Sequence, residues 1–103
     1  MSNHNFELVK LRKSLGLAQP AMAKRMGLSL RPYQQLELNP EKIRPRHIRL
    51  AESVALEIAI EQKDPELAPT SVRKKAMALA RLIIRGNIRQ KARELTALIL
   101  DEE

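Results

Sequence analysis

The sequence predicts an all-α protein made of a small N-terminal helical domain and a C-terminal helical extension. Apolar residues recur at spacings of three and four along most of the chain, as on one face of a helix, and no stretch alternates as a strand does. Phe6 and Tyr33 are the only aromatic residues, so the core must be built from aliphatic side chains, which suits helices. The length of 103 residues allows one compact domain, or one small domain with a helical appendage.

The sequence pattern of residues 1–62 predicts four short helices separated by turns. The first covers about residues 5–15 and ends at Gly16, and the second begins at Pro20 and ends at Gly27. Ser29 is the expected N-cap of a third helix over about residues 30–38. A polar loop over residues 39–44 leads to Pro45, which opens a fourth helix that continues to about residue 62. The residues expected to face the core are Leu8, Leu11, Leu15, Met22, Ala23, Met26, Tyr33, Leu36, Ile48, Ala51, Val54, Ala55, Ile58 and Ala59.

Residues 63–69 contain two prolines and predict a linker to a C-terminal helical region over residues 70–103. Gly86 and Asn87 interrupt the apolar pattern of this region. Asn87 with Gln90 matches a capping box, which favours two helices. The alternative is one long helix that contains Gly86 at a cost of about 1 kcal/mol.

The net charge of +7 is unevenly distributed. Residues 1–50 hold ten Lys and Arg against three acids, whereas residues 51–103 hold nine of each sign. An excess of positive charge in the first half is expected of a surface that meets phosphates. The alternative is a basic protein whose charge only keeps it soluble.

Several classes of protein are excluded by what the chain contains. Without cysteine there is no disulfide framework or thiolate metal site, and His4 and His47 are too far apart to indicate a metal cluster. We expect His47 at the surface. No set of residues for nucleophilic or acid–base catalysis is present, so we expect neither an enzyme nor a cofactor. The sequence shows no signal peptide and no bilayer-spanning stretch, so we expect a cytoplasmic protein that does not contact a membrane.

Residues 19–37 match the spacing of a helix-turn-helix. Ala23 stands where two helices must cross closely and a small residue is needed. Gly27, four residues later, stands in the turn, where the backbone needs positive φ. Apolar residues flank the turn and return on the second helix at the required offsets, namely Met22, Met26, Leu28, Tyr33 and Leu36.

With Leu11 to Glu37 followed by Arg44-Pro-Arg and Leu50-Ala51, residues 5–60 resemble the Cro/C1 (XRE) family of phage-repressor-type helix-turn-helix proteins. The resemblance implies a five-helix, all-α DNA-binding domain that acts as a dimer on a two-fold symmetric operator. It also implies that the third helix, here about residues 30–38, is the recognition helix in the major groove.

The resemblance also assigns roles to particular residues. Base-edge readers would be Leu30, Arg31 and Gln35, with Gln34 beside them. Residues for the DNA backbone would be Gln19, Lys42, Arg44 and Arg46. Arg12 and Glu37 match a family ion pair that ties the first helix to the third. The chemistry agrees for the polar readers, because Arg is the commonest bidentate partner of guanine and Gln can pair with adenine.

We therefore expect a sequence-specific regulator of transcription that binds double-stranded DNA, acting as a repressor and as a homodimer joined through residues 70–103. The alternative is a protein-interaction module, such as an antitoxin or anti-activator, whose C-terminal helices bind a partner protein. RNA is disfavoured, because the chain lacks exposed aromatic residues that stack on unpaired bases.

Overall fold

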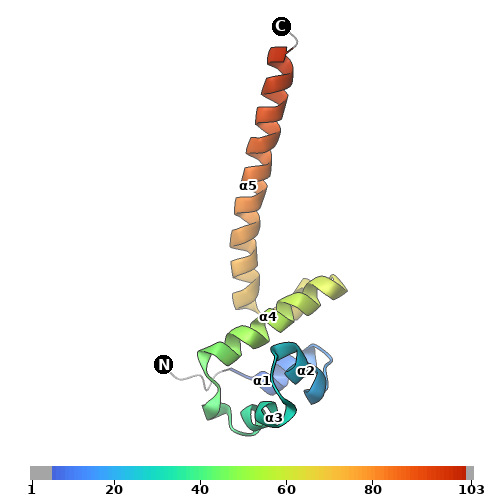
Figure 1. Cartoon of the computed structure of the whole chain (residues 1–103), viewed down its shortest axis with the longest axis vertical. Coiled ribbons are helices and arrows are strands. Elements are labelled where there is room, and N and C mark those ends of the chain that lie inside the picture. The colour runs from blue at the N-terminus through green and yellow to red at the C-terminus, as the bar shows by residue number, and fades with distance from the viewer. Residues whose placement is uncertain (1–5, 102–103) are drawn as a thin grey trace. The chain divides into compact units, whose positions relative to one another are not determined.

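The computed structural model describes residues 6–101, and within that range every regular element is helical, which confirms the all-α class (Figure 1). The ends of the predicted domains, residues 1–5 with His4 and residues 102–103, lie outside the described range. The α-helices are α1 (Leu8–Ser14), α2 (Gln19–Met26), α3 (Leu30–Leu38), α4 (Pro45–Gln62) and α5 (Thr70–Asp101). Two short 3-10 helices, η1 (Pro40–Lys42) and η2 (Pro65–Leu67), precede α4 and α5. None of the described helices combines the length and apolar character needed to cross a membrane.

The chain divides into two units between Pro69 and Thr70. The N-terminal unit contains α1 to α4 with both 3-10 helices, and the second unit is α5 alone. The five α-helices are thus shared four and one, whereas the family resemblance implies five in the N-terminal domain. The reason is local: the prolines at 65 and 69 leave room for a single 3-10 turn after α4.

The helices of the N-terminal unit begin and end close to the predicted residues, because backbone turns stop them. After α1, Gly16 has φ +71°, and the N–H of Leu17 donates to the carbonyl of Arg12 at 3.2 Å. After α2, Gly27 has φ +76°, and the N–H of Leu28 donates to the carbonyl of Ala23 at 2.9 Å. These are Schellman caps, in which a left-handed residue lets the chain satisfy the last carbonyls of the helix.

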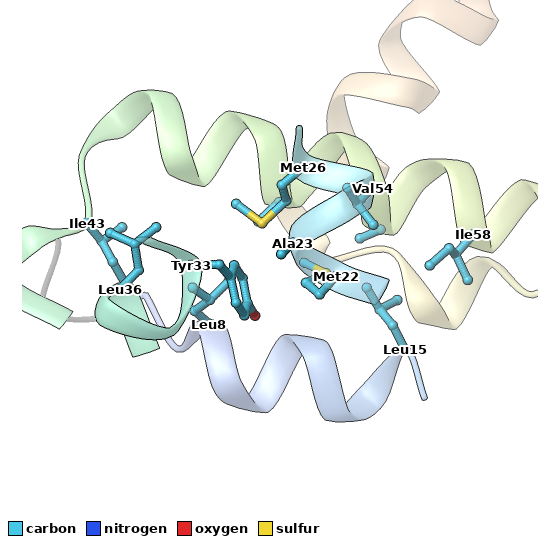
Figure 2. Packing of buried hydrophobic residues seen from close by; sticks show 12 residues of the cluster. Leu8, Leu15, Met22, Ala23, Met26, Tyr33, Leu36, Ile43, Val54 and Ile58 are labelled. Carbon is cyan, nitrogen blue, oxygen red and sulfur yellow. The ribbon is translucent and has the colours of Figure 1, made fainter. Parts of the chain in front are cut away.

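The core of the N-terminal unit is aliphatic except for Tyr33, which is fully buried (Figure 2). Figure 2 shows Leu36 and Ile43 at one end of the cluster and Leu15 and Ile58 at the other. The predicted inward residues of α2, α3 and α4 are buried as expected, with Leu11 and Ile48 partly buried at the margin.

The segment between α3 and α4 differs from the prediction of a polar loop. It contains η1 and places Ile43 in the core at 1% exposure. His47, expected at the surface, is buried, and its Nδ1 accepts the N–H of Arg44 at 2.9 Å. The expectation was wrong because the imidazole supplies an acceptor for a backbone N–H that has no partner at the start of α4.

The predicted linker, residues 63–69, is folded onto the N-terminal unit rather than free. Lys63 has φ +54° and directs the N–H of Asp64 to the carbonyl of Ala59 at 2.9 Å, so α4 also ends in a left-handed cap. The Asp64 side chain then accepts the N–H of Glu66 at 3.1 Å at the start of η2, and Leu67 packs against the core. The two prolines therefore shape a 3-10 turn that belongs to the N-terminal unit.

The C-terminal region is one continuous helix, so the two-helix prediction was wrong. Gly86 lies inside α5, and Asn87 caps nothing. The cost of one interior glycine, about 1 kcal/mol, is small beside the hydrogen bonds that a break would leave unmade at two new helix ends. The residues on both sides of Gly86 are mostly Ala, Leu, Ile and Arg, of which Ala, Leu and Arg are strong helix formers.

Candidate functional site

The outward side of α3 carries the polar residues that were predicted from the sequence to read DNA bases. Because Tyr33 and Leu36 point into the core, Arg31 and Gln35 are exposed and Gln34 is half-buried beside them. Leu30, at the start of the helix, is 40% exposed. We call this set, with Gln19, the α3 surface. A shallow hollow in it is lined by Val9, Gln19, Arg31, Gln34, Gln35, Glu37 and Leu38.

Beneath the α3 surface lies an ion pair that fixes α3 to α1. Arg12 Nε donates to Glu37 Oε2 at 2.7 Å, and Arg12 Nη2 donates to Glu37 Oε1 at 3.2 Å. The two side chains are 12% and 6% exposed, respectively. Arg12 Nη1 also donates to the carbonyl of Leu17 at 3.0 Å. The guanidinium is therefore held at several points, and the expected pair is present as a bidentate contact.

Glu37 is the centre of this network, because it also accepts from Tyr33 Oη and from Gln19 Nε2, the latter at 2.8 Å. Burial alone would raise the pKa of Glu37, but the hydrogen bonds from Arg12, Tyr33 and Gln19 outweigh it and hold the pKa below its usual range. Burial and the bond to Glu37 both raise the pKa of Tyr33. At neutral pH the carboxylate is thus charged and the phenol is neutral.

The network reaches the surface through two amides. Gln19 Oε1 accepts from Gln34 Nε2 at 3.1 Å, so the side chains form a chain from Glu37 through Gln19 to Gln34. This chain fixes which end of each amide faces outward. Gln34 keeps its carbonyl oxygen and one N–H for an outside partner, and Gln19 keeps one N–H. Gln19 is therefore a link between core and surface as well as a residue with one donor to offer.

Gln35 is oriented differently. Its Oε1 accepts from Asn39 Nδ2 at 3.1 Å, and Asn39 Nδ2 also lies 3.3 Å from the carbonyl of Gln35. The Gln35 amide nitrogen thus remains available. Arg31 makes no salt bridge with any described carboxylate, and it is exposed and lines the same hollow as Gln34 and Gln35.

The three basic residues that follow α3 lie on a segment that is anchored by buried side chains. Lys42, Arg44 and Arg46 are all exposed, while the residues between and after them, Ile43 and His47, are buried. Arg44 Nη1 also donates to the carbonyl of Glu41 at 3.1 Å. Burial lowers the pKa of His47, and the positive charges of Arg46 and Arg44 lower it further, so the imidazole is neutral and accepts a hydrogen bond.

Both units are positively charged. Residues 1–69 have a net charge of +3 and residues 70–103 have a net charge of +4, so the positive charge is not confined to the first unit. Within the first unit, α4 carries Arg46 and Arg49 near its start, whereas its later turns carry Glu52, Glu57 and Glu61. The basic end is the one that continues from α3 and η1.

The structure brings Gln19, Arg31, Gln34 and Gln35 together around one hollow, and it places Lys42, Arg44 and Arg46 on the segment that follows. The side chains that orient these residues were not predicted from the sequence. The roles of Asn39 and His47 were missed because both act through hydrogen bonds to nearby residues, which leave no periodic signal. No protein-family model, curated protein or solved structure matches this chain.

Proposed function

We propose that this protein is a Cro/C1-type regulator of transcription that binds double-stranded DNA in a sequence-specific manner through the α3 surface. One observation carries the proposal: α3 presents Arg31, Gln34 and Gln35 outward, while a buried ion pair fixes the same helix from behind. A reader of base edges needs such a rigid support, because small displacements of donor and acceptor atoms remove the hydrogen bonds that discriminate bases.

The chemistry of each group supports a role at the DNA. The Arg31 fork fits the O6 and N7 acceptors of guanine, and a Gln amide with both a donor and an acceptor fits adenine. Leu30 can contact a thymine methyl group. Lys42, Arg44 and Arg46 would meet phosphates, at the end of the unit where the N-terminus of α4 also favours anions.

We propose a binding protein rather than an enzyme. Glu37, the carboxylate of α3, is committed to Arg12, Tyr33 and Gln19, and its depressed pKa makes it a poor proton donor or acceptor at neutral pH. The remaining polar groups of the α3 surface are amides and a guanidinium, which recognise ligands by hydrogen bonds. We further propose that the protein is a dimeric, cytoplasmic repressor, which would place two copies of α3 about 34 Å apart on an inverted repeat.

The test begins with selection of preferred duplexes from a random library by the full chain. Arg31→Ala is then compared with wild type on the selected duplex and on a random one at one salt concentration. We expect a loss of about 1 to 3 kcal/mol on the selected site and a much smaller loss on random DNA.

Lys24→Ala is the matched control, because it removes one exposed positive charge from α2 and Lys24 is not among the residues proposed to contact DNA or the second copy. If both variants lose the same affinity on both duplexes, only net charge matters and Arg31 does not read a base. Failure to enrich any sequence would overturn the proposal itself. Arg44→Ala and Arg46→Ala should weaken binding to all duplexes about equally, and each should reduce the salt slope by about 0.9 for every phosphate that is no longer neutralised.

The second candidate is a protein-interaction module, such as an antitoxin or anti-activator. The observation in its favour is the row of exposed apolar side chains on α5, which no described side chain of α5 itself can cover. It predicts a monomer that acquires a partner of another kind, whereas the dimer predicts self-association of the purified chain.

A further inference from the structure

The helix α5 exposes a straight row of large apolar side chains. Met77, Ile84, Ile88, Leu95 and Ile99 are each between 53% and 63% exposed. Their spacings alternate between seven and four residues, so every second member recurs after eleven residues, which is three helical turns. The row therefore keeps to one face of α5. Leu79, Leu82 and Ile83 are also exposed, but they lie on other faces of the first half of the helix.

Four of the five members of the row are symmetric about position 86; the fifth, Ile99, has Arg73 at the equivalent position. Met77 and Leu95 lie nine residues from this position on either side, Ala80 and Ala92 lie six, and Ile84 and Ile88 lie two. When two identical helices run antiparallel across a two-fold axis, residues equally far from the axis meet. An axis at position 86 would thus set Met77 against Leu95 of a second copy and Ile84 against Ile88, with the two alanines between them.

The charges of α5 distinguish the two possible directions of a second helix. The described residues of α5 include eight Lys and Arg and only two acids. Three of the basic residues stand together at 73–75, near the start, while the acids, Glu94 and Asp101, stand near the end. A parallel pair would align every basic residue with its own copy. An antiparallel pair sets the basic start of one helix beside the acidic end of the other, which is the favourable arrangement.

We infer that the apolar row of α5 is the interface between two copies of this chain, packed antiparallel with the two-fold axis at position 86. This inference deepens the dimer of the proposed function and gives it a direction and a register. It depends on self-association alone, and DNA binding is not needed for it.

The absence of native cysteine makes the register directly measurable. Full-length chains carrying Met77→Cys or Leu95→Cys are treated, singly and mixed after joint refolding, with a bismaleimide shorter than two helical turns, about 11 Å. In the antiparallel pair, the two copies of position 77 are about 27 Å apart. We expect covalent dimer in the mixture and its loss in either variant alone.

Gly86→Cys is the matched control, because position 86 lies at the same level of the helix but on the face opposite Ile84 and Ile88. A Cβ at Gly86 meets no atom within 4 Å, so the variant fits the helix. It should give no covalent dimer. Circular dichroism checks that each variant is as helical as wild type, and light scattering gives the mass without crosslinking.

Three outcomes would overturn the inference. Covalent dimer from Met77→Cys alone, as strong as from the mixture, means a parallel pair. Covalent dimer from Gly86→Cys as strong as from the mixture means that another face is used. A monomeric mass at all concentrations with no crosslinked product means that the row serves a different protein. The experiment contains no DNA, so its outcome does not depend on whether the protein binds DNA.

Discussion

The N-terminal unit and α5 use the same aliphatic residues in opposite ways. In the N-terminal unit, Met22, Val54 and Ile58 are buried against residues of other helices, and a largely buried ion pair joins α1 to α3. In α5, residues of similar size such as Ile84 and Leu95 remain exposed. Composition therefore does not decide burial. A side chain is buried within one chain only where other helices of that chain surround it.

This difference teaches where the stability of each region comes from. The N-terminal unit builds its core from its own helices, so its stability should not depend on protein concentration. A single helix gains little from propensity alone, and most helical stability in proteins comes from packing. If α5 pairs with a second copy, its stability rises with concentration by mass action.

Glu37→Ala should give the largest effect, a loss of about 3 kcal/mol in the free energy of unfolding of the N-terminal unit. The substitution leaves the mostly buried guanidinium of Arg12 without its counterion and removes an acceptor from Tyr33 and Gln19. Breaking one side of a buried pair is strongly destabilising for this reason. The chain has one tyrosine and no tryptophan, so the fluorescence of Tyr33 in a denaturant titration reports on this unit alone.

The matched control is Glu57→Ala in α4, in the unit on which Tyr33 reports. Glu57 is exposed and acts on Arg25 through its charge. Its removal should change stability by less than about 0.5 kcal/mol. Should Glu37→Ala prove too unstable to measure, Arg12→Ala and the double variant complete a cycle in which the double loss is smaller than the sum of the single losses. Equal small losses at Glu37 and Glu57 would show that the N-terminal unit does not depend on its ion pair.

Replacing a glycine with alanine should destabilise the N-terminal unit at one position and stabilise α5 at another. Gly27→Ala forces a Cβ onto a backbone with φ +76° and should cost about 1 kcal/mol. Gly86→Ala replaces a helical glycine and should stabilise α5 by about 1 kcal/mol. An added Cβ meets no atom within 4 Å at either position, so backbone conformation alone decides the sign.

Tyr33 fluorescence should register the loss at Gly27, and far-UV circular dichroism at one protein concentration should register the gain at Gly86. Gly27→Asn is the control for backbone conformation, because asparagine tolerates the left-handed region better than alanine does. A loss from both alanine variants would mean that α5 needs the glycine for a close approach, and a gain from both would exclude strain at the turn.

Much of the fold was predictable from the sequence because its signals are local. Apolar spacing identified Met22, Ala23 and Met26 as one buried face, and the glycines at 16 and 27 marked helix ends, since each fills a left-handed position. The Arg12–Glu37 pair was expected from the resemblance and is present, although its partners lie 25 residues apart. Sequence patterns therefore predicted the local conformation and the inward face of most helices.

The errors have two physical causes: single contacts can override the preference of a segment, and the preference of a long segment can override a local break signal. Ile43 was assigned to a polar loop by its neighbours, yet one apolar side chain is enough to turn the segment inward. Gly86 and Asn87 carried the signal of a break, yet helix formers on both sides continued the helix. In the site, the Gln19–Gln34 contact joins two amides 15 residues apart, and no spacing rule predicts it.

The smallest expected effect is the loss of stability of the N-terminal unit in acid that results from protonation of His47, a loss that α5 should not share. Burial and the nearby Arg46 and Arg44 lower its pKa in the folded state, so the unfolded chain binds its proton at higher pH than the folded chain does. The stability that the neutral imidazole contributes is complete above the unfolded pKa, about 6.5, and is lost as the pH falls from there through the folded pKa. Glu37, whose pKa is also lowered, affects stability only below its ordinary value of 4.5, so the range from about pH 5 to 7 isolates the histidine.

Denaturant titrations followed by Tyr33 fluorescence should show falling stability across that range, and His47→Gln should flatten the curve because glutamine does not titrate. The helicity of α5, which contains no histidine, should stay constant over the same range. A wild-type curve as flat as that of His47→Gln would mean that His47 is accessible to protons in the folded state and does not hold the start of α4.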